Sequence, residues 1–361
     1  MTQGLAPASA LLLTALCGTL LRLELAYFTY GNYDMDSWRI VAGIVSGGGN
    51  VYAETTRYAY SPIWFAVLGL LERVRSVFPF LPFHFLVKAF LTFTDLLSMV
   101  FIALISQRRK ISPAVPAALF YLNPISILLT GVHGHFDSAA IVPLLAGIAA
   151  CLRYGGASSA GKAALWLGSS LGMWIKHSLF FEPILCVNAS VKSWWVKAAL
   201  LAGTVAGFLL LFLPYWVEGK EGILRLLFHI TPPPRRYGVA LFFPGWAMYK
   251  APFLAAACLF PLMIRKKDLL SQCLLGMLFF LVFTPIIGIQ YFVLPVALGA
   301  LRPSKWFFLY TLIGTLFILG SPVNLHVLWL AFVRGNYLWA VAAVWFVAEL
   351  KRPVDPSCRL I

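Results

Sequence analysis

Charged residues are scarce in this chain, and acidic residues are the scarcest of them. Only 11% of the 361 residues are charged and 61% are hydrophobic, and 13 Asp and Glu residues stand against 28 Lys and Arg residues. A soluble domain carries about 25% charged residues, so the composition excludes a soluble fold of this size. The apolar residues recur in stretches close to the roughly 20 residues that cross a bilayer core. The sequence therefore predicts an all-α integral membrane protein.

Paired cysteine motifs and a basic leader are also lacking. The six cysteines have no CxxC spacing, which indicates neither a disulfide framework nor a zinc site, so we expect them to pack as small apolar side chains. Residues 8–28 form an apolar run with no basic segment before it, which favours a retained first span over a signal peptide. The cysteines are Cys17, Cys151, Cys186, Cys258, Cys273 and Cys358.

What the chain does have is a surplus of basic residues in short clusters between the apolar runs. The net charge of +15 forms no single basic face, so no nucleic-acid partner is expected. Lys and Arg in short loops resist translocation, and we therefore place these clusters on the cytoplasmic side. They are Arg108 to Lys110, Arg153 with Lys162, Lys192 with Lys197, Arg265 to Lys267, Arg302 with Lys305, and Lys351, Arg352 and Arg359.

With every cluster inside, the apolar runs predict a multi-pass helical bundle of about twelve transmembrane helices with both ends inside. Residues 1–361 then form a single transmembrane domain. The predicted spans are 8–28, 84–106, 113–131, 138–152, 163–180, 181–190, 198–217, 250–264, 269–284, 290–301, 306–320 and 326–348.

Three polar tracts fall on the extracytoplasmic side in this arrangement. They are a first long loop at 29–83, a short segment from His133 to Asp137, and a second long loop at 218–249. Within the first loop, residues 61–81 are apolar but contain three charged residues, and a crossing there would move the Arg108 cluster outside. We expect this segment to form an interfacial helix on the outer surface. The chemistry should lie where the three tracts converge.

The first loop carries two carboxylates just beyond the first span. Asp34 and Asp36 lie at the expected membrane surface, where partial desolvation suits a carboxylate for proton abstraction. Two solvated loop acids would have the same spacing, so the pair alone leaves both readings open. The residues that follow are Trp38, three glycines at 47–49, Tyr52, and Tyr58-Ala59-Tyr60-Ser61-Pro62.

This series resembles the first luminal loop of the GT-C glycosyltransferases. It is most similar to the polyprenyl-phosphate-mannose-dependent mannosyltransferases, including the catalytic subunit of GPI mannosyltransferase I and the mycobacterial phosphatidylinositol-mannoside enzymes. The resemblance implies a GT-C-like bundle, with Asp34 as general base, Asp36 as the alternative, and Trp38, Tyr52 and Tyr60 at the substrate.

A second motif follows the third predicted span. Asn123-Pro124 precedes His133-Gly134-His135-Phe136-Asp137, which is similar to the NP and HGxFD signature of the dolichol-phosphate-glucose-dependent transferases. The resemblance implies that His133, His135 and Asp137 orient the sugar or the acceptor. Two imidazoles and a carboxylate also suit a transition metal. Hydrogen bonding is the commoner use of such a loop, so no metal and no other cofactor is expected.

Three further pairs are candidates for substrate binding. Gln290-Tyr291 resembles the QY stretch late in these enzymes, and Lys176-His177 puts a costly cation at the outer end of a span unless Lys176 snorkels to the surface. Arg235 and Arg236 follow three prolines in the second loop, where paired guanidiniums could hold a phosphate. Attraction to anionic lipid headgroups is the alternative for these arginines.

Together these features predict an inverting glycosyltransferase that moves a hexose, mannose first, from a polyprenyl-phosphate sugar to a lipid or glycan hydroxyl on the extracytoplasmic face. Compact size favours a bacterial inner membrane over the endoplasmic reticulum. A transporter or flippase of lipid-linked saccharides is the main alternative, although no internal repeat is evident. A non-catalytic partner subunit is the third reading.

Overall fold

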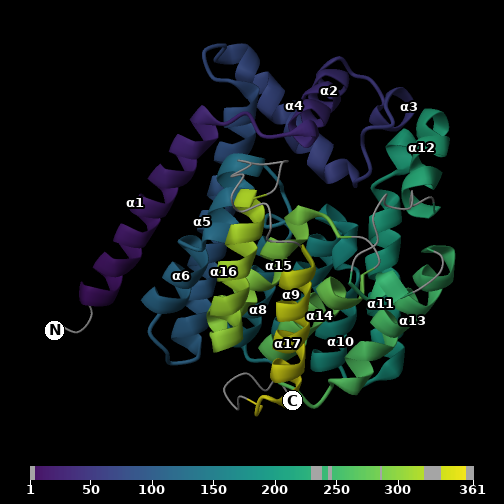
Figure 1. Cartoon of the computed structure of the whole chain (residues 1–361). Coiled ribbons are helices and arrows are strands. Elements are labelled where there is room, and N and C mark those ends of the chain that lie inside the picture. Colours follow the sequence, from purple (N-terminus) through teal and green to yellow (C-terminus); the bar gives the residue numbers. More distant parts are fainter. Residues whose placement is uncertain (1–4, 229–237, 243–245, 285–286, 321–334, 355–361) are drawn as a thin grey trace.

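The chain folds almost wholly into helices. The computed structural model describes residues 5–228, 238–242, 246–284, 287–320 and 335–354, and no strand occurs in these ranges (Figure 1). The all-helical prediction is thus confirmed for the described part of the chain. The α-helices are α1 (Leu5–Phe28), α2 (Tyr33–Ser46), α3 (Val51–Glu54), α4 (Pro62–Val77), α5 (Phe83–Arg108), α6 (Ala114–Tyr121), α7 (Pro124–Ile127), α8 (Ile141–Tyr154), α9 (Ser159–Ile175), α10 (Phe181–Ser190), α11 (Trp194–Leu210), α12 (Trp216–Phe228), α13 (Trp246–Met263), α14 (Leu269–Phe283), α15 (Leu294–Leu301), α16 (Lys305–Gly320) and α17 (Gly335–Lys351).

Several of these helices are long and apolar enough to cross a membrane. The clearest are Ala8–Phe28, Phe83–Arg108 and Trp194–Leu227, and a fourth span results if Ala114–Tyr121 and Pro124–His133, bent by 45°, act together. Five further apolar helices are shorter, at 10–17 residues. These helices support a helical membrane protein. The count of twelve crossings stays a prediction, because a helix of about 15 residues rises only about 22 Å.

One end of the molecule is formed by the helices of the predicted first outer loop. Helices α2, α3 and α4 lie together there, above the bundle (Figure 1). Val41 of α2 and Trp64 and Leu68 of α4 belong to one buried apolar cluster. The sequence predicted a helix at 61–81, and α4 falls within it, beginning at Pro62 as its fixed φ favours. Further interfacial helices were expected in this loop, but the position of α2 was not predicted.

The basic clusters meet at the opposite end, near the last described residues (Figure 1). Arg302 Nε lies 2.8 Å from Glu349 Oε1, and Arg302 Nη1 lies 3.2 Å from Asp268 Oδ1. Arg352 also contacts Glu349, and Lys267 Nζ donates to Arg352 O at 2.7 Å. Three clusters that are distant in sequence therefore share one end of the bundle, as their assignment to one side of a membrane requires.

A buried ion pair joins α1 to α5 inside the bundle. Arg22 Nε lies 3.4 Å from Asp95 Oδ2, and both side chains are fully buried. The Arg22 guanidinium also donates to Tyr121 O at 2.6 Å and Ser126 Oγ at 2.9 Å, while Thr130 Oγ1 donates to Asp95 Oδ2 at 2.7 Å. Such pairing is what makes an intramembrane charge tolerable. The network fixes α7 and the π-helical turn η2 (Leu128–His133) against α1 and α5.

Candidate functional site

The start of α2 presents Asp34. The Asn32 side chain caps the helix by accepting from Asp34 N at 3.0 Å, so Asp34 falls in the first turn. An N-cap Asn followed by an acid is the expected pattern at a helix N-terminus, where unpaired N–H groups favour negative charge. The Asp34 side chain is 35% exposed. It can therefore meet both the protein interior and an incoming molecule.

A tight reversal brings the second motif to this helix. Turn η2 ends at His133, and Gly134 adopts a φ of +77°, in the left-handed region that favours glycine. A Cβ on Gly134 would lie 2.6 Å from Met35 Cε, so any other residue would also displace the end of the Met35 side chain. The reversal stacks the rings of His133 and His135 at 4.3 Å and places Asn32 Nδ2 2.8 Å from His133 Nε2.

Four charged side chains form a continuous polar chain through this region. His135 Nε2 lies 2.8 Å from Asp34 Oδ2, and His135 Nδ1 lies 3.5 Å from Asp137 Oδ2. Lys176 Nζ donates to the same Asp137 oxygen at 3.1 Å. His135, Asp137 and Lys176 are buried. We call Asp34, His135, Asp137 and Lys176 the polar chain; it links the first outer loop to the end of α9.

The signs of the charges alternate along the polar chain, which shifts each pKa. Burial opposes ionisation of Asp34, but the hydrogen bond and charge of His135 outweigh it and hold the Asp34 pKa below its usual range. Burial likewise opposes a charged His135, yet contacts with Asp137 and Asp34 raise its pKa. For Asp137, the charge of Lys176 and the His135 contact overcome burial and lower the pKa. The polar chain thus favours the ionised form of both carboxylates and the protonated form of His135.

Asp36 is not part of this arrangement. Its side chain is exposed and accepts a hydrogen bond from Tyr30 OH at 2.6 Å. Residues two apart on a helix point to different faces, so Asp36 turns away when Asp34 meets His135. The geometry favours Asp34 over Asp36 as the reactive carboxylate.

Aromatic side chains pack behind the polar chain. Trp38 is only 1% exposed, and its ring lies 5.8 Å from Phe136 and 6.4 Å from His135. Tyr52 OH donates to Tyr60 O at 2.8 Å, which fixes the loop that carries Tyr60. Trp38 therefore supports the site from within the core, and Tyr52 braces the loop that faces the cavity.

A cavity of about 540 Å³ opens beside Lys176. Lys176 Nζ lies 4.3 Å from the centroid of the Tyr60 ring and 5.6 Å from that of Tyr291, and both tyrosines line the cavity. Arg225 and Lys250 add two further cations. The other lining residues are mostly apolar or neutral: Tyr52, Thr55, Thr56, Tyr58, Ala59, His177, Ser178, Phe180, Phe208, Gly222, Leu226, Leu227, Phe253, Leu254, Phe280 and Thr284.

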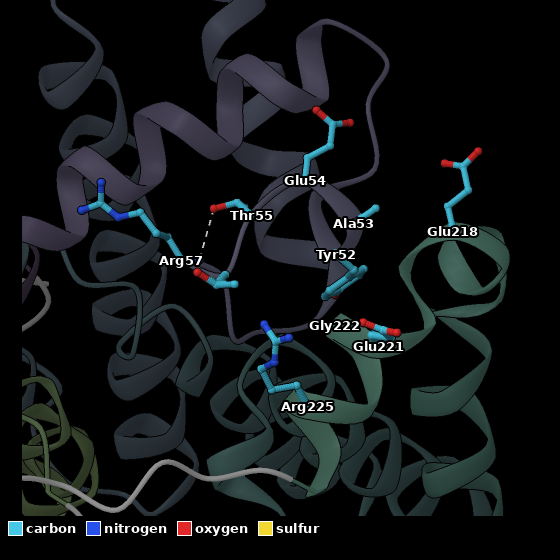
Figure 2. A pocket seen from close by; sticks show the side chains of 10 residues that line it. Tyr52, Ala53, Glu54, Thr55, Arg57, Glu218, Glu221, Gly222 and Arg225 are labelled. Atoms are coloured by element: carbon cyan, nitrogen blue, oxygen red, sulfur yellow. Dashed lines mark hydrogen bonds between the residues drawn. The ribbon is translucent and has the colours of Figure 1, made fainter.

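A second, polar hollow of about 460 Å³ adjoins the cavity between α3 and α12 (Figure 2). Tyr52 and Arg225 belong to the lining of both. Figure 2 shows Glu221 and Arg225 on α12, below the loop that carries Thr55 and Arg57. The Arg57 guanidinium lies 4.0 Å from the centroid of the Tyr33 ring, next to Asp34. The polar hollow thus extends from the cavity toward the start of α2.

Several predicted residues contribute less or cannot be placed. Tyr291 and His177 line the cavity, but Gln290 is half-buried in the turn η6 (Ile289–Val293) and does not line it. Arg235 and Arg236 lie outside the described residues. The described cations that face the cavity are therefore Lys176, Arg225 and Lys250.

One set of donors here could hold a metal ion. Donor atoms of Asp34, His133 and His135 all lie within 4.8 Å of one another. The sequence pointed to Asp137 as the carboxylate of such a set, whereas the fold brings Asp34 to the two imidazoles. This donor set suits a transition metal. In the structure the same atoms are engaged in hydrogen bonds with Asn32 and with each other.

Three buried charged residues that support the site were not among the residues predicted from the sequence. Lys88 Nζ donates to Thr29 O at 2.6 Å, which secures the chain between α1 and Asp34, and the Arg22–Asp95 pair secures η2. The signal for all three was present, because an ionisable residue inside an apolar run is a functional or structural candidate by default.

Comparison with known proteins assigns no family to the chain. No protein-family model matches it, and no curated protein sequence matches it significantly. The order of the motifs and the geometry of the polar chain are therefore the basis for any functional conclusion.

Proposed function

We propose that this protein is an inverting glycosyltransferase that uses a polyprenyl-phosphate sugar as donor. One observation carries the proposal: the half-exposed carboxylate of Asp34 is joined through His135 and Asp137 to Lys176, which borders the cavity. The polar chain thus holds a base, Asp34, at one end and a cation, Lys176, at the other. Transfer from a lipid phosphate needs both.

The cavity suits the donor. A polyprenyl chain requires apolar walls, and the phosphodiester that joins it to the sugar requires cations at one end of them. Phe208, Phe253 and Leu254 supply apolar wall, while Lys176 and Arg225 supply charge. The volume of about 540 Å³ lies within the usual range of small-molecule sites, roughly 300–1,000 Å³. It would hold the sugar, the phosphate and the first part of the tail, and the remaining tail would lie in lipid.

The proposed reaction is a single in-line displacement. The acceptor hydroxyl oxygen forms a bond to the anomeric carbon as its proton passes to Asp34, and the bond between that carbon and the phosphate oxygen breaks. The electron pair leaves with the phosphate, whose developing charge Lys176 and Arg225 offset. Attack from the face opposite the leaving group inverts the anomeric centre. His135 holds Asp34 Oδ2, so the other carboxylate oxygen is available to the hydroxyl.

The substrate details rest on the family resemblance and on the basic clusters. Mannose is the first candidate for the sugar, and a lipid or glycan hydroxyl is the acceptor. The site lies at the end of the bundle opposite the Arg302 network, which puts it on the extracytoplasmic face if that network is cytoplasmic. A bacterial inner membrane is the proposed location.

A flippase of lipid-linked saccharides is the second candidate. The observation in its favour is the cavity itself, because apolar walls with three cations would bind a lipid phosphate without any reaction. A flippase, however, has no need of a hydrogen-bonded carboxylate such as Asp34.

The test is a transfer assay with the purified full-length chain. It is incubated with radiolabelled polyprenyl-phosphate mannose, glucose or arabinose and a panel of lipid acceptors, with Asp34→Asn as the negative control. Labelled product from the wild-type chain and none from the variant is the expected result. If no donor gives product while the protein moves labelled donor across liposome membranes, the flippase reading replaces the enzyme reading.

A further inference from the structure

A second cluster of chemically active side chains lies away from the polar chain, between α10 and α14. Glu182 and Cys186 are four residues apart and so share one face of α10, and Cys273 faces them from α14. One donor atom from each residue lies within 4.8 Å of the other two, and all three residues are buried. The reaction proposed above uses none of them.

Glu182 has no adequate partner in this environment. It is 1% exposed, and apart from a contact with the Cys273 thiol its carboxyl oxygens have no hydrogen-bond partner among the described residues. Buried polar groups are nearly always satisfied, so an unpartnered carboxyl group points to a missing ligand or ion. The polar groups beside it are two thiols, which are only weak hydrogen-bond donors. Thiols and a carboxyl group are, however, good metal ligands.

We propose that Cys186, Cys273 and Glu182 bind a divalent thiophilic cation, zinc in the first instance. Thiolate ligands select zinc over harder cations such as magnesium. Cys186 and Cys273 each release a proton on binding, and the two thiolates neutralise the ion. Glu182 binds as a carboxylate, because a ligand to the metal must be deprotonated. With two thiolates and this carboxylate the site carries one net negative charge, and binding to the protonated side chains releases three protons per ion by this balance.

The metal would tie α10 to α14 and so stabilise one wall of the cavity. The rings of Phe181 and Phe280, which belong to these two helices, stack at a centroid distance of 5.8 Å. Phe280 lines the cavity, as does Phe180, the residue before α10. Helix α10 has only 10 residues, so a cross-link in its first two turns would hold most of its length. The role is structural and does not depend on the reaction proposed for Asp34.

The test avoids slow entry of metal into a folded bundle. The full-length chain is synthesised cell-free into lipid nanodiscs, under reducing conditions, with Cd²⁺ as a spectroscopic substitute for zinc. We expect about one Cd²⁺ per chain together with ultraviolet thiolate-to-metal charge-transfer absorption. Cys186→Ser and Cys273→Ser should each lower that absorption roughly tenfold or more, whereas Cys258→Ser, at an exposed cysteine, should leave it unchanged. His133→Ala should also leave it unchanged, since imidazole ligands give no thiolate band.

Two further variants keep the proposal open to refutation if the serine variants fold poorly. Glu182→Gln retains a carbonyl oxygen and should keep the absorption, while Glu182→Leu should lose bound Cd²⁺. The proposal is overturned if the wild-type chain shows no charge-transfer band, if the band survives in the Cys186→Ser/Cys273→Ser double variant, or if the two cysteines are found as a disulfide. None of these outcomes bears on sugar transfer.

Discussion

His135 Nε2 lies 2.8 Å from Asp34 Oδ2, although the two residues are 101 positions apart in the chain. This contact joins the two motifs that stood out in the sequence into one site. It also determines which carboxylate oxygen is occupied and which is free.

Replacing Asp34 by Asn should sharply reduce transfer while leaving a folded protein. Asp34→Asn keeps the size of the side chain and an oxygen for His135, but it removes the basic group. Turnover should fall by about 10²–10⁴-fold, the usual contribution of a positioned base. Initial rates of labelled product formation measure the effect, and donor binding should change little.

Asp36→Asn is the matched control, because Asp36 is exposed and bonded only to Tyr30 among the contacts described for its side chain. Its turnover should stay within about threefold of wild type, as for other surface changes. If Asp36→Asn is inactive while Asp34→Asn is active, the assignment of the base is wrong.

Lys176→Met should destabilise the fold as well as the site. The substitution leaves the carboxylate of Asp137 buried without its lysine partner and with only the contact to His135, and breaking a buried pair costs about 3–5 kcal/mol. The double variant Lys176→Met/Asp137→Asn should recover much of the lost thermal stability, because it removes the stranded charge. Lys220→Met, at an exposed position on α12, should leave the unfolding temperature unchanged. Failure of the double variant to recover any stability would contradict the pairing.

Stability should depend on pH through the polar chain. The pKa of His135 is raised in the folded protein. Its contribution to the free energy of unfolding is therefore complete below the ordinary imidazole value of about 6.5 and is lost as the pH rises through the raised value. The pKa values of Asp34 and Asp137 are lowered, so their contributions are present above about 4 and are lost as the pH falls through the lowered values. The unfolding temperature measured in detergent should therefore be highest between about pH 4 and 6.5.

His135→Gln removes the group that titrates on the alkaline side. Its unfolding temperature should be lower at pH 6 and should decline less than that of wild type as the pH rises further. An alkaline decline that is identical in the two proteins would assign the pH dependence to other groups.

Arg225→Ala should weaken donor use. Arg225 borders both the cavity and the polar hollow, where it can meet the donor phosphate. Loss of a charge-assisted hydrogen bond corresponds to ~1.5–3 kcal/mol, so the KM for donor should rise roughly 10- to 100-fold. Lys220→Ala on the same helix faces neither space and should leave KM unchanged. Equal effects of the two variants would mean that α12 acts only through its overall charge.

Cysteine labelling tests the sidedness of the bundle. After replacement of the exposed Cys17 and Cys258 by serine, a membrane-impermeant maleimide added from outside should label Ser46→Cys and not Lys266→Cys. Ser46 and Lys266 are both exposed, so a cysteine at either position can react if the reagent reaches its side of the membrane. The opposite labelling pattern would place the polar chain on the cytoplasmic side and exclude an extracytoplasmic donor.

The sequence was sufficient to predict a helical membrane protein and to select Asp34, His135, Asp137 and Lys176 as candidates, but not how their segments meet. The contact between Asp34 and His135 depends on a tertiary fold, and α2, which decides between Asp34 and Asp36, has a weak signal in a polar loop. Once α2 is known to be a helix, the two acids fall on different faces and the choice follows. The roles of Trp38 and Tyr52 could not be predicted, because the sequence does not distinguish an aromatic residue that contacts a substrate from one that packs in the core.

The number of membrane crossings shows a second limit of sequence reasoning. Apolar runs such as 181–190 and 290–301 look alike whether they cross a bilayer or fill the interior of a bundle. The structure gives α10 only 10 residues and α15 only 8. Helices of this length rise about 12–15 Å, which is half of a bilayer core of roughly 30 Å.

The Arg22–Asp95 pair has a consequence for the order in which the protein is made. A guanidinium near the middle of a lone helix costs about 2.5–3.5 kcal/mol during insertion, so α1 first enters the bilayer with Arg22 reaching for the interface. Its neutralising partner is on α5, which leaves the ribosome only after the whole segment containing α2, α3 and α4. We therefore expect the first helix to reach its final depth only when α5 arrives, and the loop bearing Asp34 to take its place at that stage.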